Sequence, residues 1–352
     1  MRQGIGKTGK RLLAAAWAML MLLGMNGCGV PPETLNRYQI SSLELFDTVT
    51  VITGYAADET AFRKKADAIL EELGEYHRLY DIYHTYEGIH NAKTINDQAG
   101  GAPVTVDGRL MDLLELGERI CRESEGKTDI TLGAVLGLWH EAREAAEAHP
   151  ETAAIPEREA LEEAKRHTGF ELLEIDREQG TVRLTDLEAR LDLGALAKGY
   201  AVQQVCGALE AGWLVSVGGN VYASGPKPDN GGAWSIGIQE PDGGGSDFLH
   251  VVTAEKGAIV TSGDYQRYYE VDGKRYHHLI DPETCMPGEK WRAVTVLHED
   301  SGVADGLSTA LFLMDREEGE SLLERLGGEA CWVDADGRVW YSQGYEARLK
   351  AE

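Results

Sequence analysis

Apolar side chains recur every three or four residues along several stretches of the chain. This spacing places them on one face of a helix. The predicted helices span residues 58–79, 107–124, 141–166, 195–210, 302–314 and 317–326. Asp107 is a suitable N-cap for the second helix. The third helix is rich in acidic residues, and we interpret its charges as a solvated face.

Shorter runs rich in Val, Ile and Thr predict strands. They span residues 39–53, 170–176, 181–185, 189–193, 213–217, 233–239, 248–254 and 292–298. Asp-Gly pairs at 272–273 and 336–337 favour tight two-residue turns and predict two hairpins. Residues 80–101 have neither pattern and predict a long polar loop. Strands in runs, with helices inserted between them, predict an α+β fold.

Polar side chains gather at both ends of the first predicted hairpin. Ser262 and Asp264 precede it, and His277, His278 and Asp281 follow it. If the hairpin forms, its two ends meet, and an imidazole beside carboxylates suits acid–base chemistry. The alternative is a polar hairpin with incidental histidines.

Two further pairs of residues carry candidate chemistry. Asp305 and Thr309 are four residues apart near the start of a predicted helix, so they share one face. A carboxylate and a hydroxyl one turn apart can hold Mg²⁺; alternatively, Asp305 is a surface residue and Thr309 packs by its methyl group. Asp192 and Lys198 flank a Gly-Ala turn at the start of a helix. Asp192 alone could be a helix cap, and Lys198 alone a surface lysine.

Six segments in order, together with residues 258–288, closely resemble the ApbE family, the FAD:protein FMN transferases. The segments are Leu45-Phe-Asp-Thr48, Thr94-Ile-Asn-Asp97, Thr128-Asp-Ile-Thr131, Leu191-Asp-Leu-Gly-Ala-Leu-Ala-Lys-Gly-Tyr200, Val217-Gly-Gly-Asn220 and Ala304-Asp-Gly-Leu-Ser-Thr-Ala310. The resemblance implies an ApbE-type, T-fold-like fold of mixed sheets with flanking helices and a flavin cleft between two lobes. It also implies Mg²⁺-dependent transfer of FMN from FAD to a threonine or serine of an acceptor protein, with release of AMP.

The resemblance implies a role for individual residues. His278 would take the proton of the acceptor hydroxyl, and Asp281 or Asp264 would orient it. Mg²⁺ would be held by the Ala195 carbonyl, Asp305 and Thr309. The flavin nucleotide would contact Phe46, Tyr83, Lys127, Thr128, Asp129, Asp192, Lys198 and Ser308.

The sequence departs from the family pattern at Thr128, where an aromatic residue is common, and at Cys285, where a glycine is usual. Two other functions are compatible with the same residues. One is an FAD pyrophosphatase that uses water as the acceptor. The other is a non-enzymatic flavin- or solute-binding lipoprotein.

The N-terminus has the layout of a bacterial lipoprotein signal peptide. Four basic residues precede an apolar run over residues 12–23, and Cys28 follows a small residue. We therefore expect a signal peptide over 1–28, a lipid anchor at Cys28 on the extracytoplasmic side of the cell membrane, a tether over 29–37 and one two-lobed domain over 38–345. Simple cleavage and secretion, or an uncleaved anchor, are the alternatives.

The net charge of the chain limits the classes of molecule that it can bind. The formal net charge is −25, and loss of the four basic groups in residues 1–30 makes it −29 (−25 − 4). This charge argues against nucleic acid as a partner, because its phosphates need a basic patch. A dianionic pyrophosphate would be repelled, which favours a divalent cation at the site. The expected partners are FAD and an acceptor flavoprotein of a membrane redox system. We interpret the four remaining cysteines as buried free thiols: Cys121, Cys206, Cys285 and Cys331.

Overall fold

The computed structural model describes residues 35–229, 231–241 and 247–351. The expected signal peptide, Cys28 and most of the tether lie outside the described residues. Within them, no helix is long and apolar enough to cross a membrane.

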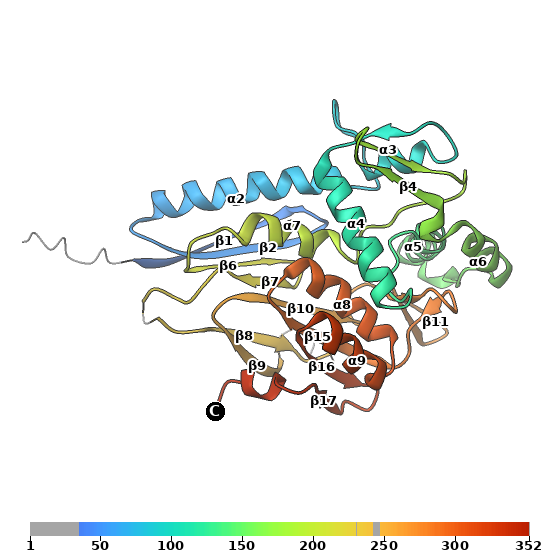
Figure 1. The fold of residues 1–352 in the computed structure, drawn as a ribbon. Coiled ribbons are helices and arrows are strands. Elements are labelled where there is room, and N and C mark those ends of the chain that lie inside the picture. The colour runs from blue at the N-terminus through green and yellow to red at the C-terminus, as the bar shows by residue number, and fades with distance from the viewer. Residues whose placement is uncertain (1–34, 230, 242–246, 352) are drawn as a thin grey trace, which may run out of the picture.

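An eight-stranded antiparallel sheet forms the centre of the molecule (Figure 1). Its strands, in spatial order, are β1 (Asn36–Leu45), β2 (Thr48–Ala56), β6 (Trp213–Val217), β7 (Asn220–Ala223), β10 (Gly257–Gly263), β15 (Trp291–His298), β16 (Glu329–Asp334) and β17 (Val339–Tyr341). The central strands are almost continuously buried. Other elements therefore cover both faces of the sheet at these central strands.

Helices cover one face of this sheet. They are α2 (Glu59–Tyr80), α4 (Gly108–Glu123), α7 (Ala197–Cys206), α8 (Ser301–Leu313) and α9 (Arg316–Leu326). α2, α7 and α8 contact the strands directly. Every residue of α8 except Thr309 is buried, as expected for a largely apolar helix that packs on several sides.

A hairpin covers part of the opposite face. It consists of β8 (Trp234–Gln239) and β9 (Phe248–Ala254), with a short 3₁₀ helix, η4 (Tyr345–Arg348), beside it. Ile259 packs in this second apolar cluster, whereas its neighbours Ala258 and Val260 pack on the helical side. This alternation is expected for a strand buried on both faces.

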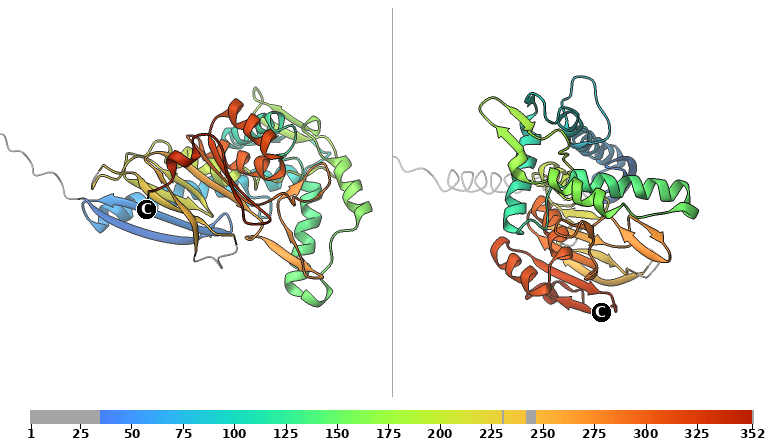
Figure 2. Two further views of the ribbon diagram at one scale, coloured as in Figure 1. Left: turned by 90° about the horizontal axis from the view of Figure 1, so that it is seen from below. Right: turned by 90° about the vertical axis from the view of Figure 1, so that its right-hand side faces the viewer.

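The other elements form a smaller part on one side of the sheet (Figure 2). They are α3 (Ala92–Asp97), β3 (Val104–Thr105), α5 (Gly133–Ala148), η1 (Pro150–Thr152), α6 (Arg158–Ala164), η2 (Lys165–His167), η3 (Phe170–Leu172), β4 (Leu173–Asp176), β5 (Thr181–Leu184), β11 (Tyr268–Val271), β12 (Lys274–His277), β13 (Ile280–Asp281) and β14 (Met286–Pro287). Trp139 of α5 stacks on Tyr276 of β12, with ring centroids 5.9 Å apart. Its Nε1–H donates to the Cys285 carbonyl at 2.9 Å. α5 and the β11–β12 hairpin are thus held together.

The α+β class and most predicted elements are confirmed. Asp58 and Asp107 cap α2 and α4 by accepting backbone N–H bonds. Asp272 and Gly273 form the predicted tight turn, with φ of +51° and +77°. Cys285 has φ +57°, so the position where the family usually has glycine keeps the left-handed backbone that glycine favours.

Some predicted elements are wrong. Residues 39–53 are not one strand but two, joined by a turn in which Phe46 and Asp47 have φ of +53° and +49°. No glycine or asparagine marks this turn, so the sequence did not reveal it. Residues 80–101 contain α3, and residues 189–193 form only an isolated bridge between Leu132 and Arg190. Residues 141–166 are not one helix, because α5 begins earlier, at Gly133, and ends at Ala148, and α6 begins at Arg158.

Candidate active site

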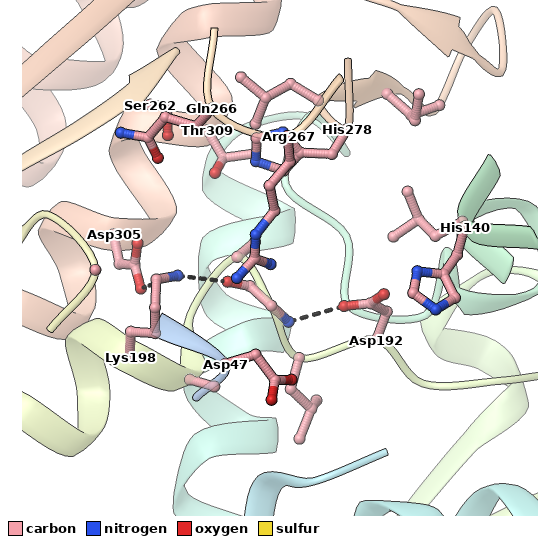
Figure 3. Close-up of a pocket in the computed structure, with 18 of the residues that line it drawn as sticks. Asp47, His140, Asp192, Lys198, Ser262, Gln266, Arg267, His278, Asp305 and Thr309 are labelled. Atoms are coloured by element: carbon pink, nitrogen blue, oxygen red, sulfur yellow. Dashed lines mark hydrogen bonds and ion pairs between the residues drawn. The ribbon is translucent and has the colours of Figure 1, made fainter. Parts of the chain in front are cut away.

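A cavity of about 410 Å³ opens between the large sheet, α5 and the β11–β12 hairpin. This volume is typical of small-molecule sites. Figure 3 shows polar side chains converging on it from several elements. The predicted site residues that line it are Phe46, Tyr83, Lys127, Asp129, Asp192, Ala195, Lys198, His278, Asp305 and Thr309.

Asp192 and Lys198 hold the turn that precedes α7. Asp192 Oδ1 accepts the N–H of Gly194 at 2.8 Å, and Lys198 Nζ donates to the Gly194 carbonyl at 3.0 Å (Figure 3). A Cβ atom at Gly194 would lie 3.0 Å from Asp192 Oδ1. The two side chains thus fix the backbone that presents Ala195 to the cavity.

Asp305 is the buried carboxylate of the site. Its side chain is 6% exposed, and its Oδ2 accepts the N–H of Gly199 at 2.8 Å. Lys198 Nζ lies 3.7 Å from the same oxygen. Burial raises the pKa of Asp305, and the charge of Lys198 and the hydrogen bond from Gly199 oppose this rise. A side chain at Gly199 would collide with Ser301 and Asp305, so glycine here lets α7 approach α8.

The oxygen atoms around Asp305 fit a hard cation. The described residues hold no cluster of three or more His, Cys, Asp or Glu that could bind a metal. A magnesium ion, however, usually uses one or two carboxylates with substrate phosphates and water. Thr309, the one residue of α8 that is not buried, lines the cavity one turn after Asp305. Asn220 Oδ1 also lies at this cavity, buried and without a hydrogen-bond donor among the described residues.

His277 and His278 both border the cavity but differ in their bonding. His277 Nε2 lies 2.8 Å from the Gly288 carbonyl, and its Nδ1 accepts the N–H of Leu279 at 3.2 Å. Both of its ring nitrogens are therefore used within the protein. His278 Nδ1 is buried and has no partner among the described residues. Burial, followed by the charges of Arg267, His277 and Lys198, lowers the pKa of His278 to about 3. The His278 imidazole is therefore uncharged near neutral pH.

Arg267 also lines the cavity, and none of the sequence motifs indicates it. Its carbonyl accepts the N–H of His278 at 3.1 Å, which extends the pairing of Tyr268 with His277 by one residue. Residues directly opposite in antiparallel strands point to the same face. The Asp-Gly turn already fixes this register, so counting back from it would have identified Arg267 as the neighbour of His278.

α5 contributes two further residues that the sequence did not indicate. Arg143 NH2 lies 2.7 Å from His140 Nδ1, and the His140 ring lies 5.2 Å from the Tyr83 ring. Both α5 side chains line the cavity. Arg143 belongs to the predicted helix 141–166, whose charges suggest a solvated face; His140 lies just before it, and no local motif marks either residue.

The two predicted carboxylate partners of His278 are engaged elsewhere. Asp264 Oδ2 accepts a hydrogen bond from Arg292 at 2.7 Å. Asp281 forms an ion pair with Lys127, 3.1 Å from Nζ to Oδ2. Neither lines the cavity. The structure thus does not place Asp264 or Asp281 where they would orient the imidazole.

Two residues that are predicted to contact the nucleotide form hydrogen bonds within the protein instead. The Thr128 hydroxyl donates to the Gly306 carbonyl at 2.9 Å. The Ser308 hydroxyl lies 2.8 Å from that of Ser262 and donates to the Asp305 carbonyl. Both residues are buried and do not line the cavity. Their role here is to tie neighbouring segments to α8.

The remaining residues that are predicted to contact the nucleotide also line the cavity. The Phe46 N–H donates to His77 Nδ1 at 3.2 Å, which holds the strained β1–β2 turn against α2. Tyr83 is 47% exposed. Asp129 Oδ1 accepts the N–H of Thr131 at 2.7 Å, and burial raises the pKa of Asp129.

The chain matches the model of the ApbE family over residues 46–332. A relative from Treponema pallidum named FAD:protein FMN transferase is 34% identical over 274 residues, which span 73% of this chain and 74% of the relative. A second FAD:protein FMN transferase, from Vibrio cholerae, is 30% identical over 313 residues, which span 87% of this chain and 89% of the relative.

Solved structures agree with the sequence matches. The ApbE protein from Thermotoga maritima is 29% identical, has a TM-score of 0.79, and is matched over 90% of this chain and all of its own. The flavin transferase ApbE from Vibrio cholerae has a TM-score of 0.74 at 25% identity, over the same shares of the two chains. The chain belongs to the ApbE family.

Proposed function

We propose that this protein transfers FMN from FAD to a threonine or serine hydroxyl of an acceptor protein and releases AMP. The relatives named FAD:protein FMN transferase support this activity. The observation in this chain that carries it is one cavity with a buried carboxylate, cationic side chains and an imidazole nitrogen without a protein partner. These are the groups that phosphoryl transfer to a hydroxyl needs.

The chain's own residues support a simple displacement. The acceptor oxygen attacks the phosphorus of the FMN half, the new P–O bond forms, and the P–O bond to AMP breaks and leaves its electrons on AMP. His278 accepts the proton of the hydroxyl, because its imidazole is neutral and one of its nitrogens has no protein partner. Substrate phosphates beside Arg267 and Lys198 would offset the charges that lower the pKa of His278, so we expect it to be a stronger base when FAD is bound.

We assign Mg²⁺ to the oxygen atoms of Ala195, Asp305 and Thr309. Asp305 is the one carboxylate of this set, and Thr309 is the one residue of α8 that is not buried. When bound, the cation would neutralise phosphate charge as a Lewis acid. Lys198, 3.7 Å from Asp305 Oδ2, is the nearest protein cation to this carboxylate among the ion pairs of the site.

Incubation with FAD and an acceptor protein, with and without a chelator, tests the function. We expect covalent flavin on the acceptor and one AMP for each flavin attached, and loss of both with the chelator. Free FMN and AMP in place of covalent flavin would instead identify a pyrophosphatase. Binding of FAD with no turnover at any Mg²⁺ concentration would identify a flavin-binding protein.

We also propose that the protein is anchored at Cys28 on the extracytoplasmic side of the cell membrane and acts on a flavoprotein of a membrane redox system. The layout of the first 28 residues supports the anchor. Stable anchoring needs more than one acyl chain. Cys28→Ser should release the protein from the membrane fraction or block its maturation. An unmodified Cys28 in the mature protein, found by intact-mass measurement, would contradict the anchor.

A further inference from the structure

The guanidinium of Arg267 has no hydrogen bond or ion pair with any residue that the structure describes. The other lysine and arginine side chains that line the cavity each contact a protein acceptor: Lys127 contacts Asp281 at 3.1 Å, Arg143 contacts His140 Nδ1 at 2.7 Å, and Lys198 contacts the Gly194 carbonyl at 3.0 Å. Arg267 therefore offers all its donors to the cavity or to solvent.

Backbone pairing directs Arg267 toward the reacting groups. Its carbonyl accepts the N–H of His278, so the two residues lie opposite each other and emerge from the same face of the hairpin. In Figure 3 the side chain extends from the His278 side of the cavity toward Lys198 and Asp192. The guanidinium thus lies between the imidazole and the turn that precedes α7.

A second cation at this position is unfavourable without an anion. Lys198 and Arg143 line the same cavity, and like charges in a partly buried site repel one another. Burial and then the positive charge of Arg267 lower the pKa of His278, as expected for a guanidinium that lines the same cavity as the imidazole. The Arg267 side chain is exposed and lines the cavity, yet it pairs with none of the acidic residues that the structure describes.

We propose that Arg267 binds a phosphate of the dinucleotide substrate, an inference that rests on the proposed function. The planar guanidinium can donate two parallel N–H bonds to phosphate oxygens, which an ammonium group cannot do. Its place between His278 and Lys198 puts that phosphate beside both the proton acceptor and the Asp305 carboxylate. Arg267 is a binding residue in this account and exchanges no proton.

Arg275 provides a matched control on the same hairpin. Its guanidinium lies over the Tyr268 ring at 4.2 Å and 3.7 Å from Asp264, and it does not line the cavity. Arg275→Gln removes the same charge from the same hairpin as Arg267→Gln. A general effect of hairpin charge or stability would therefore appear in both variants.

The test compares FAD with riboflavin, which carries the same ring but no phosphate. Affinities are measured by fluorescence quenching in the presence of a chelator, so that no metal contributes. We expect Arg267→Gln to weaken FAD binding about 10- to 100-fold and to leave riboflavin binding within about twofold. Arg267→Lys should recover part of the loss, and Arg275→Gln should match the wild type.

Three results would overturn the proposal: unchanged FAD affinity in Arg267→Gln, an equal loss for FAD and riboflavin, or an equal loss in Arg275→Gln. Thermal melts of each variant identify unfolding, and an unfolded Arg267→Gln is replaced in the comparison by Arg267→Lys, which must then weaken FAD selectively. Failure of the proposed function is a separate observation, since it is the absence of covalent flavin on an acceptor with the wild-type enzyme.

Discussion

Lys198 and Asp305 meet across the contact between α7 and α8, with Nζ 3.7 Å from Oδ2. The Asp305 carboxylate also accepts the N–H of Gly199. A residue of α8 is thus held in position by the backbone of α7. A lysine at this distance partly neutralises a buried charge. The pair joins the predicted nucleotide-binding turn to the predicted metal-binding helix.

Asp305→Asn should remove Mg²⁺-dependent turnover while the protein still folds. The amide keeps an acceptor for the Gly199 N–H but loses the charge that a hard cation requires. We expect AMP release from FAD to fall by about 100-fold or more across a Mg²⁺ titration. Asp315→Asn, at the exposed N-cap of α9, is the control and should behave as wild type. Full activity of Asp305→Asn at ordinary Mg²⁺ would show that the cation is held elsewhere.

His278→Ala should slow flavin transfer about 10²- to 10⁴-fold, the usual contribution of a general base, with a much smaller effect on FAD affinity. His277→Ala should mainly lower stability, by about 1–3 kcal/mol, because it leaves the Gly288 carbonyl and the Leu279 N–H without their partner. Single-turnover flavinylation and thermal melts of both variants separate the two effects. Normal transfer by His278→Ala would assign proton removal to another group.

The pH dependence of stability provides a separate test of His278. Its pKa is lowered from 6.5 to about 3 in the folded protein. Between these values the unfolded chain binds a proton that the folded protein does not, so stability falls as the pH drops through this window. His278→Asn should remove the part of this pH-dependent loss of stability that His278 causes. That part is at most about 1.4 kcal/mol per pH unit, and it is smaller here because the His278 side chain is only partly buried. Urea unfolding at several pH values, in chelator and without FAD, measures it. Equal pH slopes for His278→Asn and the wild type would contradict the lowered pKa.

Lys127 and Asp281 should couple in stability. Their side chains are 20% and 17% exposed, and they join the start of the α5 segment to β13. A double-mutant cycle with Lys127→Met and Asp281→Asn should give a coupling of about 0.5–1 kcal/mol, since the pair is partly screened by solvent. Additive effects on the free energy of unfolding would show that the two residues act independently.

Sequence patterns predicted helices, strands and turns correctly where neighbouring residues alone determine the local structure. The Asp272-Gly273 turn fixed the β11–β12 register, and the spacing of Asp305 and Thr309 placed them on one helix face. The turn at Phe46 and Asp47 could not be predicted, because these residues adopt positive φ without a glycine. Their conformation is held by tertiary contacts, including the bond from Phe46 to His77.

The site was harder to predict where distant residues decide which groups are free. Asp281 was a reasonable partner for His278 from sequence alone, but Lys127, 154 positions away, forms an ion pair with it. Asp264 is engaged in the same way by Arg292. Arg143 and His140 line the cavity on α5, which Trp139 packs against the hairpin. Such competition between side chains depends on the packed structure and leaves no local pattern.

The intact mass of an acceptor protein after a single turnover with FAD is the most direct measure of FMN transfer. We predict a gain equal to FMN less one water, located on a threonine or serine, and no gain when a chelator is present or when that residue is changed to alanine. An acceptor of unchanged mass, with FAD converted to free FMN and AMP, would contradict the transfer reaction.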